Sequence, residues 1–217
     1  MTASSLSVRE YIADAVVHAT GVVAGTVGVV VLIVAVAVEG AAAKFAPVLI
    51  YSSGLVAMLS GSAAYNVLES SRRRELLRRL DRSAIFLMIA GTYTPFTTMC
   101  LSGTWAIGLT AVVWSIACAG IVMTLMQSRA FDRLSIPVYL ALGWAAIIAL
   151  GPLFASLAPL TLALLGAGGL IYSIGVIFHV WESLPYQKAI WHGFVLAAAA
   201  VHYAAVVEGV VIARASC

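Results

Sequence analysis

The chain has 217 residues, of which 63% are hydrophobic and 10% are charged, and its formal net charge is +3 at pH 7. Its mean hydropathy of +1.06 lies far above that of a soluble globular domain. The composition therefore excludes an ordinary soluble protein and indicates an integral membrane protein.

Seven apolar stretches are long enough to cross a bilayer core of about 30 Å, which takes roughly 20 helical residues. Short polar or turn-forming breaks separate them, and they lie near residues 15–38, 45–67, 83–101, 104–126, 135–154, 158–180 and 190–212. The alternating pattern of a membrane β-barrel is missing, and lipid otherwise admits only helices. We therefore expect an all-α membrane protein, a seven-transmembrane helix bundle that forms a single domain over residues 1–217.

The first span begins with a polar stripe. Glu10, Asp14 and His18 are spaced by four residues, which places them on one helical face. Gly21 and Gly25 continue this face as a GxxxG pattern, which is typical of helix–helix contact in membranes. We expect the stripe to face protein rather than lipid. His18 is then either a hydrogen-bonded interior histidine or a metal ligand.

The break between the second and third stretches, NVLESSRRRELLRRLDRSA at residues 66–84, carries six arginines. With seven spans it shares one membrane face with the N-terminus, and that face holds ten Lys and Arg residues against two, Lys44 and Arg214, on the other. Because positive residues are retained in the cytoplasm, the N-terminus should be cytoplasmic and the C-terminus outside. The arginines then contact anionic lipid head groups. We expect no nucleic-acid partner, since the cluster is small and lacks interleaved aromatic residues.

This topology gathers polar residues of several spans in the cytoplasmic half of the bundle. Asn66 closes the second span there, Asp81 opens the third, His179 closes the sixth and His192 opens the seventh. Ionisable residues inside a membrane often mark function. Two structural alternatives stay open: Asp81 as the N-cap of its helix, and His179 beside a tryptophan as an interfacial anchor.

Other polar residues receive no role from the sequence. His202 lies ten residues beyond His192, which is about 15 Å deeper along a helix. Glu208 falls nearer the outer face, and we assign it no function. The three cysteines, at positions 100, 118 and 217, are widely separated, so no disulfide framework is expected.

Residues 77–96, LRRLDRSAIFLMIAGTYTPF, closely resemble the third-span signature of the hemolysin III family, the bacterial branch of the progestin and adiponectin receptor (PAQR) superfamily. The similarity extends to the stripe from Glu10 to His18, to the segment from Ser62 to Asn66, and to the start of the seventh span. The resemblance implies a seven-helix protein of a bacterial plasma (inner) membrane. It also implies a zinc site near the cytoplasmic face.

The zinc site implied by the resemblance is degenerate in this chain. The family pattern supplies a His in the second span, an Asp opening the third, and two His of an H-x-x-x-H in the seventh. Those positions hold Asn66, Asp81, Lys188 and His192. An amide is a weak zinc ligand and a protonated lysine repels the ion. Zinc then requires substitute ligands, for which His18 and His179 are the candidates, or Lys188 takes the place of the metal beside Asp81.

Three functions follow from the resemblance. We favour a role in membrane-lipid homeostasis or lipid sensing, with a membrane lipid as the partner inside the bundle. The alternative is a zinc-dependent lipid amide hydrolase similar to a ceramidase, in which Ser62 and Asp81 are the first catalytic candidates. The third is the pore-forming, cytolytic activity that named the family, against which the scarcity of charged pore-lining residues argues.

Overall fold

The computed structural model describes residues 7–68, 73–126 and 129–213, and all the regular elements in these ranges are helices. In chain order they are α1 (Val8–Glu39), α2 (Ala42–Val67), α3 (Arg74–Pro95), the π-helix η1 (Phe96–Cys100), α4 (Gly103–Leu125), α5 (Arg129–Gly143), the 3-10 helix η2 (Ala145–Ala149), α6 (Leu150–Ser156), α7 (Pro159–Val180), α8 (Gln187–Val207) and the π-helix η3 (Glu208–Ile212).

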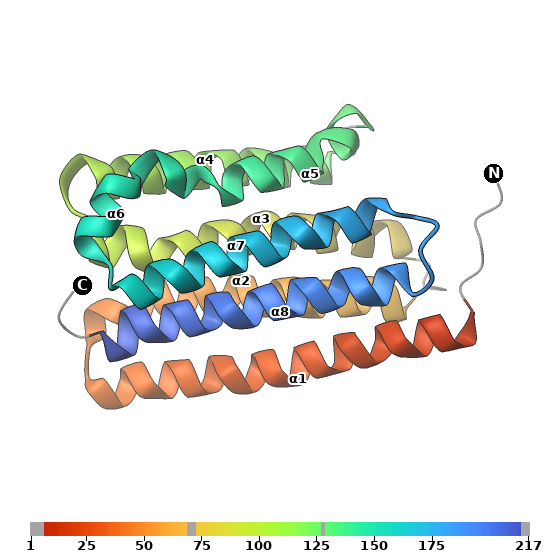
Figure 1. Ribbon diagram of the computed structural model, residues 1–217, viewed down its shortest axis with the longest axis horizontal. Coiled ribbons are helices and arrows are strands. Elements are labelled where there is room, and N and C mark those ends of the chain that lie inside the picture. Colours follow the sequence, from red (N-terminus) through yellow and green to blue (C-terminus); the bar gives the residue numbers. More distant parts are fainter. Residues whose placement is uncertain (1–6, 69–72, 127–128, 214–217) are drawn as a thin grey trace.

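The helices run side by side along one long axis of the molecule (Figure 1). α1 packs between α2 and α8, while α3 packs between α2 and α4, and α7 lies against α8. Six helices in the described part of the chain are long and apolar enough to cross a membrane; two of them combine α5 with η2 and α6, and α8 with η3. The chain is therefore a multi-pass helical membrane protein.

The third predicted span corresponds to α3 and η1, which do not meet the same criterion of length and composition. The first turns of α3 carry the charged sequence RELLRRLDR, which lowers its hydropathy. Its second half is nevertheless enclosed by protein, because Phe86 and Ala90 are fully buried and Met88 is 3% exposed. A helix surrounded by other helices can carry more charge at one end than a helix that faces lipid.

The outer surface of the bundle is apolar. On α1, Val23, Val27, Val31 and Val34 are each more than half exposed. Such a continuous apolar surface would be a liability in water, whereas lipid solvates it. The exposed faces therefore agree with the composition in placing this bundle in a bilayer.

Helices α2 and α3 approach each other closely through glycine. A Cβ added at Gly54 would lie 3.0 Å from the carbonyl oxygen of Leu87 and 3.1 Å from Cα of Met88, both backbone atoms of α3. Reciprocally, a Cβ at Gly91 would lie 3.2 Å from the carbonyl oxygen of Ile50. Small residues let helix backbones come together where lipid supplies no hydrophobic drive. This contact fixes the depth of α3 against α2.

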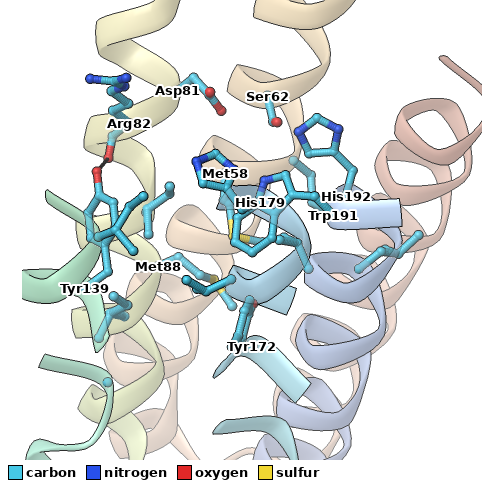
Figure 2. Close-up of a pocket in the computed structure, with 18 of the residues that line it drawn as sticks. Met58, Ser62, Asp81, Arg82, Met88, Tyr139, Tyr172, His179, Trp191 and His192 are labelled. Carbon is cyan, nitrogen blue, oxygen red and sulfur yellow. Dashed lines mark hydrogen bonds between the residues drawn. The ribbon is translucent and has the colours of Figure 1, made fainter. Parts of the chain in front are cut away.

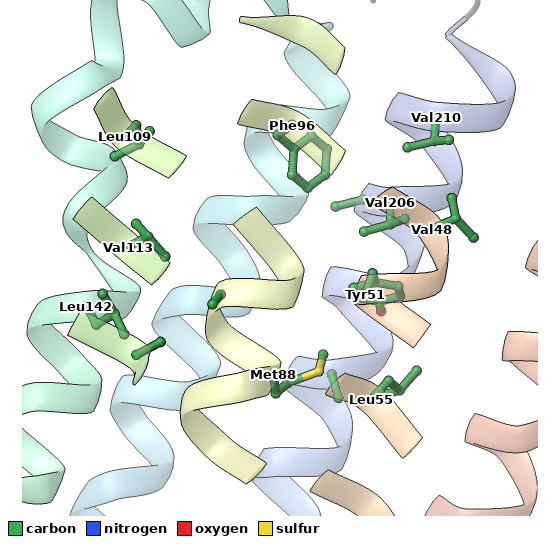
Figure 3. Close-up of a cluster of buried hydrophobic side chains, with 14 of the residues drawn as sticks. Val48, Tyr51, Leu55, Met88, Phe96, Leu109, Val113, Leu142, Val206 and Val210 are labelled. Atoms are coloured by element: carbon green, nitrogen blue, oxygen red, sulfur yellow. The ribbon is translucent and has the colours of Figure 1, made fainter. Parts of the chain in front are cut away.

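The apolar core links these helices along their length. Val48, Tyr51 and Leu55 of α2 contribute to the same buried cluster as Met88 of α3 and Val206 of α8 (Figure 3). On the other side of α3 the cluster continues into α4 and α5. Close packing of these side chains holds the helix ends, and hence the polar residues there, in fixed positions.

The fifth predicted span is one interrupted rod in the structure. Its α-helix ends at Gly143 and the chain continues as η2, so the interruption does not occur at Pro137, which lies inside α5. The hydroxyl of Tyr93 donates toward the carbonyl oxygens of Leu142 (3.1 Å) and Gly143 (2.8 Å) and accepts from the N–H of Ala146 (2.8 Å). A side chain from α3 thus satisfies the backbone groups that the interruption exposes.

At the end of the bundle opposite the arginines, Lys44 ties helix ends together. Lys44 donates to both carboxylate oxygens of Glu39 (2.8 and 2.9 Å) and to the carbonyl oxygen of Val210 (2.6 Å). Cys100, the last residue of η1, is disulfide-bonded, whereas Cys118 is free. The expectation of no disulfide was therefore wrong for Cys100, because a wide separation along the sequence does not exclude a disulfide.

Candidate functional site

Helix α1 begins earlier than the apolar pattern suggests, and its first turn is tied to α8. Ser7 and Glu10 form a capping box, in which the Ser7 side chain accepts from the Glu10 N–H at 3.3 Å and Glu10 accepts from the Ser7 N–H at 2.8 Å. The other carboxylate oxygen of Glu10 accepts from the N–H of Tyr186 at 3.0 Å. Because Tyr186 directly precedes α8, this bond sets α1 and α8 at a common depth.

One turn further along α1, Asp14 faces His192 of α8. Asp14 Oδ1 lies 2.6 Å from His192 Nδ1, and Asp14 Oδ2 lies 3.5 Å from Nε2 of His18. The rings of the two histidines are 4.3 Å apart between centroids, at 53°. A carboxylate only accepts hydrogen bonds, so with Asp14 ionised the His192 Nδ1 donates and its Nε2 remains available as an acceptor or ligand.

The group formed by Asp14, His18 and His192 has the composition of a metal site. Their ligand atoms all lie within 4.8 Å of one another, and the side chains are 7%, 6% and 12% exposed. Imidazole and carboxylate are ligands that zinc and related divalent metals accept. The Nε2 of His18 is buried and has no hydrogen-bond partner among the described residues, which is unusual for an interior polar atom. These residues therefore fit a divalent metal.

Asp81 lies outside this group. It lines the cavity from α3, together with Ser62 of α2. The helices are close here, since a Cβ added at Gly61 would lie 3.6 Å from Cα of Asp81. The structure thus brings together the predicted catalytic pair Ser62 and Asp81, and it separates Asp81 from the carboxylate–histidine group on α1 and α8.

The other predicted site residues do not complete a zinc site around Asp81. The side-chain amide nitrogen of Asn66 donates to the carbonyl oxygen of Ser62 at 3.0 Å, which is a hydrogen bond within helix α2. Lys188 lines the cavity one helical turn before His192. The His179 ring packs against Trp191 with centroids 4.8 Å apart, and its Nδ1 is buried without a hydrogen-bond partner in the described structure. An amide is a weak zinc ligand and a protonated lysine repels the ion, so the residues at the family-pattern positions do not fit zinc.

The three residues Asp14, His18 and His192 are called the metal-like group below, because their side chains match the ligands of a metal site. Asp14 is the one member of this group that was not among the predicted metal ligands. The sequence did carry a signal for it, because Asp14 and His18 share one helical face. Pairing with His192, which lies 178 residues away, could not be read from that spacing. His18, a predicted substitute ligand, does lie beside His192.

A cavity of about 480 Å³ extends from this polar end into the bundle. Ser62, Asp81, His179 and His192 lie at one end of it, and Met88 and Tyr172 lie further along (Figure 2). Its middle is lined by apolar side chains, including Met58, Leu59, Ile85, Ile136, Val176 and Leu196. The volume is within the range of small-molecule sites, and the lining is polar at the mouth and apolar inside.

The far end of the cavity carries a second set of polar groups. Trp144 donates to the hydroxyl of Ser173 at 3.0 Å, and Nε2 of His202 lies 3.1 Å from the carbonyl oxygen of Leu165. The Tyr172 hydroxyl is buried and makes no hydrogen bond within the described ranges. His202 therefore lies deep in the bundle, far from the metal-like group. Glu208 begins η3 at the opposite end of the molecule, away from the cavity lining.

This chain is similar in sequence to several known proteins. A family model described as "Haemolysin-III related" matches residues 8–203. The chain is 38% identical over 197 residues to the "Hemolysin-3 homolog" of Bacillus subtilis (strain 168), covering 91% of this chain and 92% of that protein. It is 35% identical over 203 residues to "Hemolysin-3" of Bacillus cereus, covering 94% and 93%. The human "Monocyte to macrophage differentiation factor" is 29% identical over 165 residues, covering 72% and 67%.

Proposed function

The chain belongs to the hemolysin III family, and on that premise we propose that it binds a membrane lipid inside its helical bundle, in lipid homeostasis or lipid sensing. The observation that carries the proposal is the cavity of about 480 Å³, which has charged residues at its mouth, an apolar middle and a few uncharged polar groups at its far end. A lipid has the same division, because its head group needs hydrogen bonds and its chain needs apolar contact.

The mouth offers charges suited to a lipid head group. Arg78, Arg82 and Lys188 line it together with the carboxylates of Asp81 and Glu182. Cationic side chains pair with phosphate or carboxylate oxygens, and the carboxylates accept from hydroxyl or amine groups. Such a mixed-charge mouth supports a zwitterionic or hydroxylated head group rather than a purely anionic one.

We further propose seven membrane spans, with the N-terminus in the cytoplasm of a bacterium, the C-terminus outside, and the inner membrane as the location. The span that the six long apolar helices leave out is the third, formed by α3 and η1; α3 packs against α2 and α4, and η1 packs against α4. The Arg-rich start of α3 supports a cytoplasmic mouth.

The lipid proposal is tested by blocking the cavity. Val176 on α7 lines it, whereas the next residue, Ile177, is 56% exposed on the outside of the same helix. Native mass spectrometry of the purified protein should show a retained lipid in the parent and in Ile177→Trp, and a several-fold loss of that lipid in Val176→Trp. Equal retention in the two variants would contradict lipid binding in this cavity.

A second candidate, a metal-dependent lipid amide hydrolase, is favoured by the metal-like group beside the cavity. A bound divalent metal would polarise the amide carbonyl and lower the pKa of a water. In that function the cavity walls orient the chain of the substrate, and Ser62 and Asp81 hold the amide near the group. Release of fatty acid from a ceramide by the purified protein, abolished in Asp81→Asn, is the test. Pore formation is the third candidate, and dye release from liposomes containing the protein tests it.

A further inference from the structure

The family pattern implies a metal held by α2, α3 and α8, and this chain has lost two of those four ligands, at Asn66 and Lys188. We propose that the metal position has moved to α1, so that Asp14, His18 and His192 bind one divalent metal between α1 and α8. The inference does not depend on lipid binding, because it concerns the metal content of the protein alone.

The donor set is complete enough for a metal with an exchangeable ligand. One carboxylate and two imidazoles match the three protein ligands found in zinc sites that keep a fourth position open. His18 and His192 line the cavity, while Asp14 is buried and does not line it. The fourth position therefore opens toward the cavity, where a water or an oxygen of a bound molecule can occupy it.

The distances allow a metal with small side-chain shifts. Ligand atoms of a tetrahedral zinc site, with bonds of about 2.0–2.2 Å, lie about 3.3 Å apart. Here Asp14 Oδ1 is 2.6 Å from His192 Nδ1, Asp14 Oδ2 is 3.5 Å from His18 Nε2, and all the group lies within 4.8 Å. Binding of a metal by Asp14 Oδ1 and His192 Nδ1 would replace the hydrogen bond between them, with the Nδ1 proton released to solvent, and would move these two atoms from 2.6 Å to about 3.3 Å apart.

The side chains around α1 suit a metal better than those at the family-pattern position. Asp81 is followed directly by Arg82 and lines a cavity that Lys188 also lines. Asp14 instead has two histidines as neighbours, and each can be neutral. A carboxylate beside two imidazoles supplies a ligand set that a divalent cation accepts, and Asp81 is not a member of such a group among the described residues.

The Nε2 of His18, which makes no hydrogen bond with the described residues, is a second observation. His18 is 7% exposed, and this nitrogen is buried with no hydrogen-bond partner in the described chain, although it points toward a carboxylate. Leaving a buried polar atom without a partner is costly. Coordination of the metal by His18 Nε2 would supply the missing interaction.

The test compares two carboxylates with the same substitution. The full chain is purified in detergent, reconstituted in nanodiscs and dialysed against zinc. Its zinc content is then measured by inductively coupled plasma mass spectrometry. The absorption bands of Co²⁺ report the ligand geometry. We expect one zinc per chain in the parent and in Asp81→Asn, and less than a tenth of that in Asp14→Asn and in His18→Ala. The loss of a direct ligand should weaken zinc binding by more than about 100-fold, since losing only an outer-shell partner costs 10–100-fold.

Two outcomes would overturn the inference. A parent protein without stoichiometric zinc or cobalt has no such site, and retention in Asp14→Asn with loss in Asp81→Asn returns the metal to the family position. If Asp14→Asn fails to fold by size-exclusion chromatography, His18→Ala decides, because it leaves the bond between Asp14 and His192 in place. Lipid retention, measured separately, distinguishes failure of this inference from failure of the lipid proposal.

Discussion

The close contact of α2 with α3 gives a sharp prediction for Gly54→Ala. The new Cβ would meet three backbone atoms of α3, the carbonyl oxygen of Leu87 at 3.0 Å, Cα of Met88 at 3.1 Å and the carbonyl carbon of Leu87 at 3.3 Å. Ordinary contact between non-bonded carbon atoms begins at about 3.5 Å. Backbone atoms cannot rotate away as a side chain can, so the two helices must separate by several tenths of an ångström.

The magnitude follows from two opposing terms. Overpacking a well-packed interior costs about 1–3 kcal/mol of unfolding free energy. Replacing glycine by alanine inside a helix returns up to about 1 kcal/mol, because the backbone loses less entropy on folding. Gly166 of α7 is a matched control, since a Cβ there meets no atom within 4 Å. The difference between Gly54→Ala and Gly166→Ala cancels the propensity term and should be about 1–3 kcal/mol.

The assay is unfolding of the purified protein by SDS in mixed micelles, followed by tryptophan fluorescence. The order of stability should be Gly166→Ala above Gly91→Ala above Gly54→Ala, because the Cβ at Gly91 meets its nearest backbone atom at 3.2 Å rather than 3.0 Å. The double variant of Gly54 and Gly91 should lose less than the sum, since one separation of the helices relieves both contacts. If Gly54→Ala proved as stable as Gly166→Ala, the close contact of α2 with α3 would be refuted.

Three further variants test other parts of the structure. Lys44→Met should lower the unfolding free energy by about 1–3 kcal/mol because it leaves the Glu39 carboxylate unpaired; the double variant with Glu39→Gln should recover part of the loss, and simple additivity would contradict the pairing. Tyr93→Phe should cost about 1–3 kcal/mol and speed hydrogen exchange at the start of η2, where a backbone N–H loses its acceptor. At the exposed start of α3, the hydrogen bond from Arg78 lowers the pKa of Glu75 to about 2 from an ordinary 4.5. The small stabilisation by this carboxylate, under about 1 kcal/mol, is present above pH 4.5 and lost as the pH falls toward 2. The unfolding free energies of the parent and Glu75→Gln should therefore differ at pH 7 and converge near pH 2, and an unchanged difference would show that Arg78 does not hold the carboxylate.

Local sequence features determined the class of this protein and most of its helices. In lipid, the backbone N–H and C=O groups must form hydrogen bonds within the chain. Long apolar runs therefore predict helices reliably. The boundaries were less accurate. α1 begins at Val8, before the predicted residue 15, because the capping box of Ser7 and Glu10 extends the helix into polar sequence. The catalytic roles of Ser62 and Asp81 stay a prediction.

Contacts between helices, in contrast, were decided only by the tertiary structure. The four-residue spacing placed Asp14 and His18 on one face, but the rotation and depth of α1 against α8 determined that this face meets His192. The interruption of the helix after Gly143 also depends on tertiary contacts, because the hydroxyl of Tyr93 on α3 bonds the backbone groups there. Pro137, the proline within α5, does not interrupt the helix. Helical periodicity is a property of neighbours along the chain, whereas rotation and depth come from packing between distant segments, such as the contact at Gly54. The sequence therefore determined which residues share a helix face, and only packing determined which faces meet.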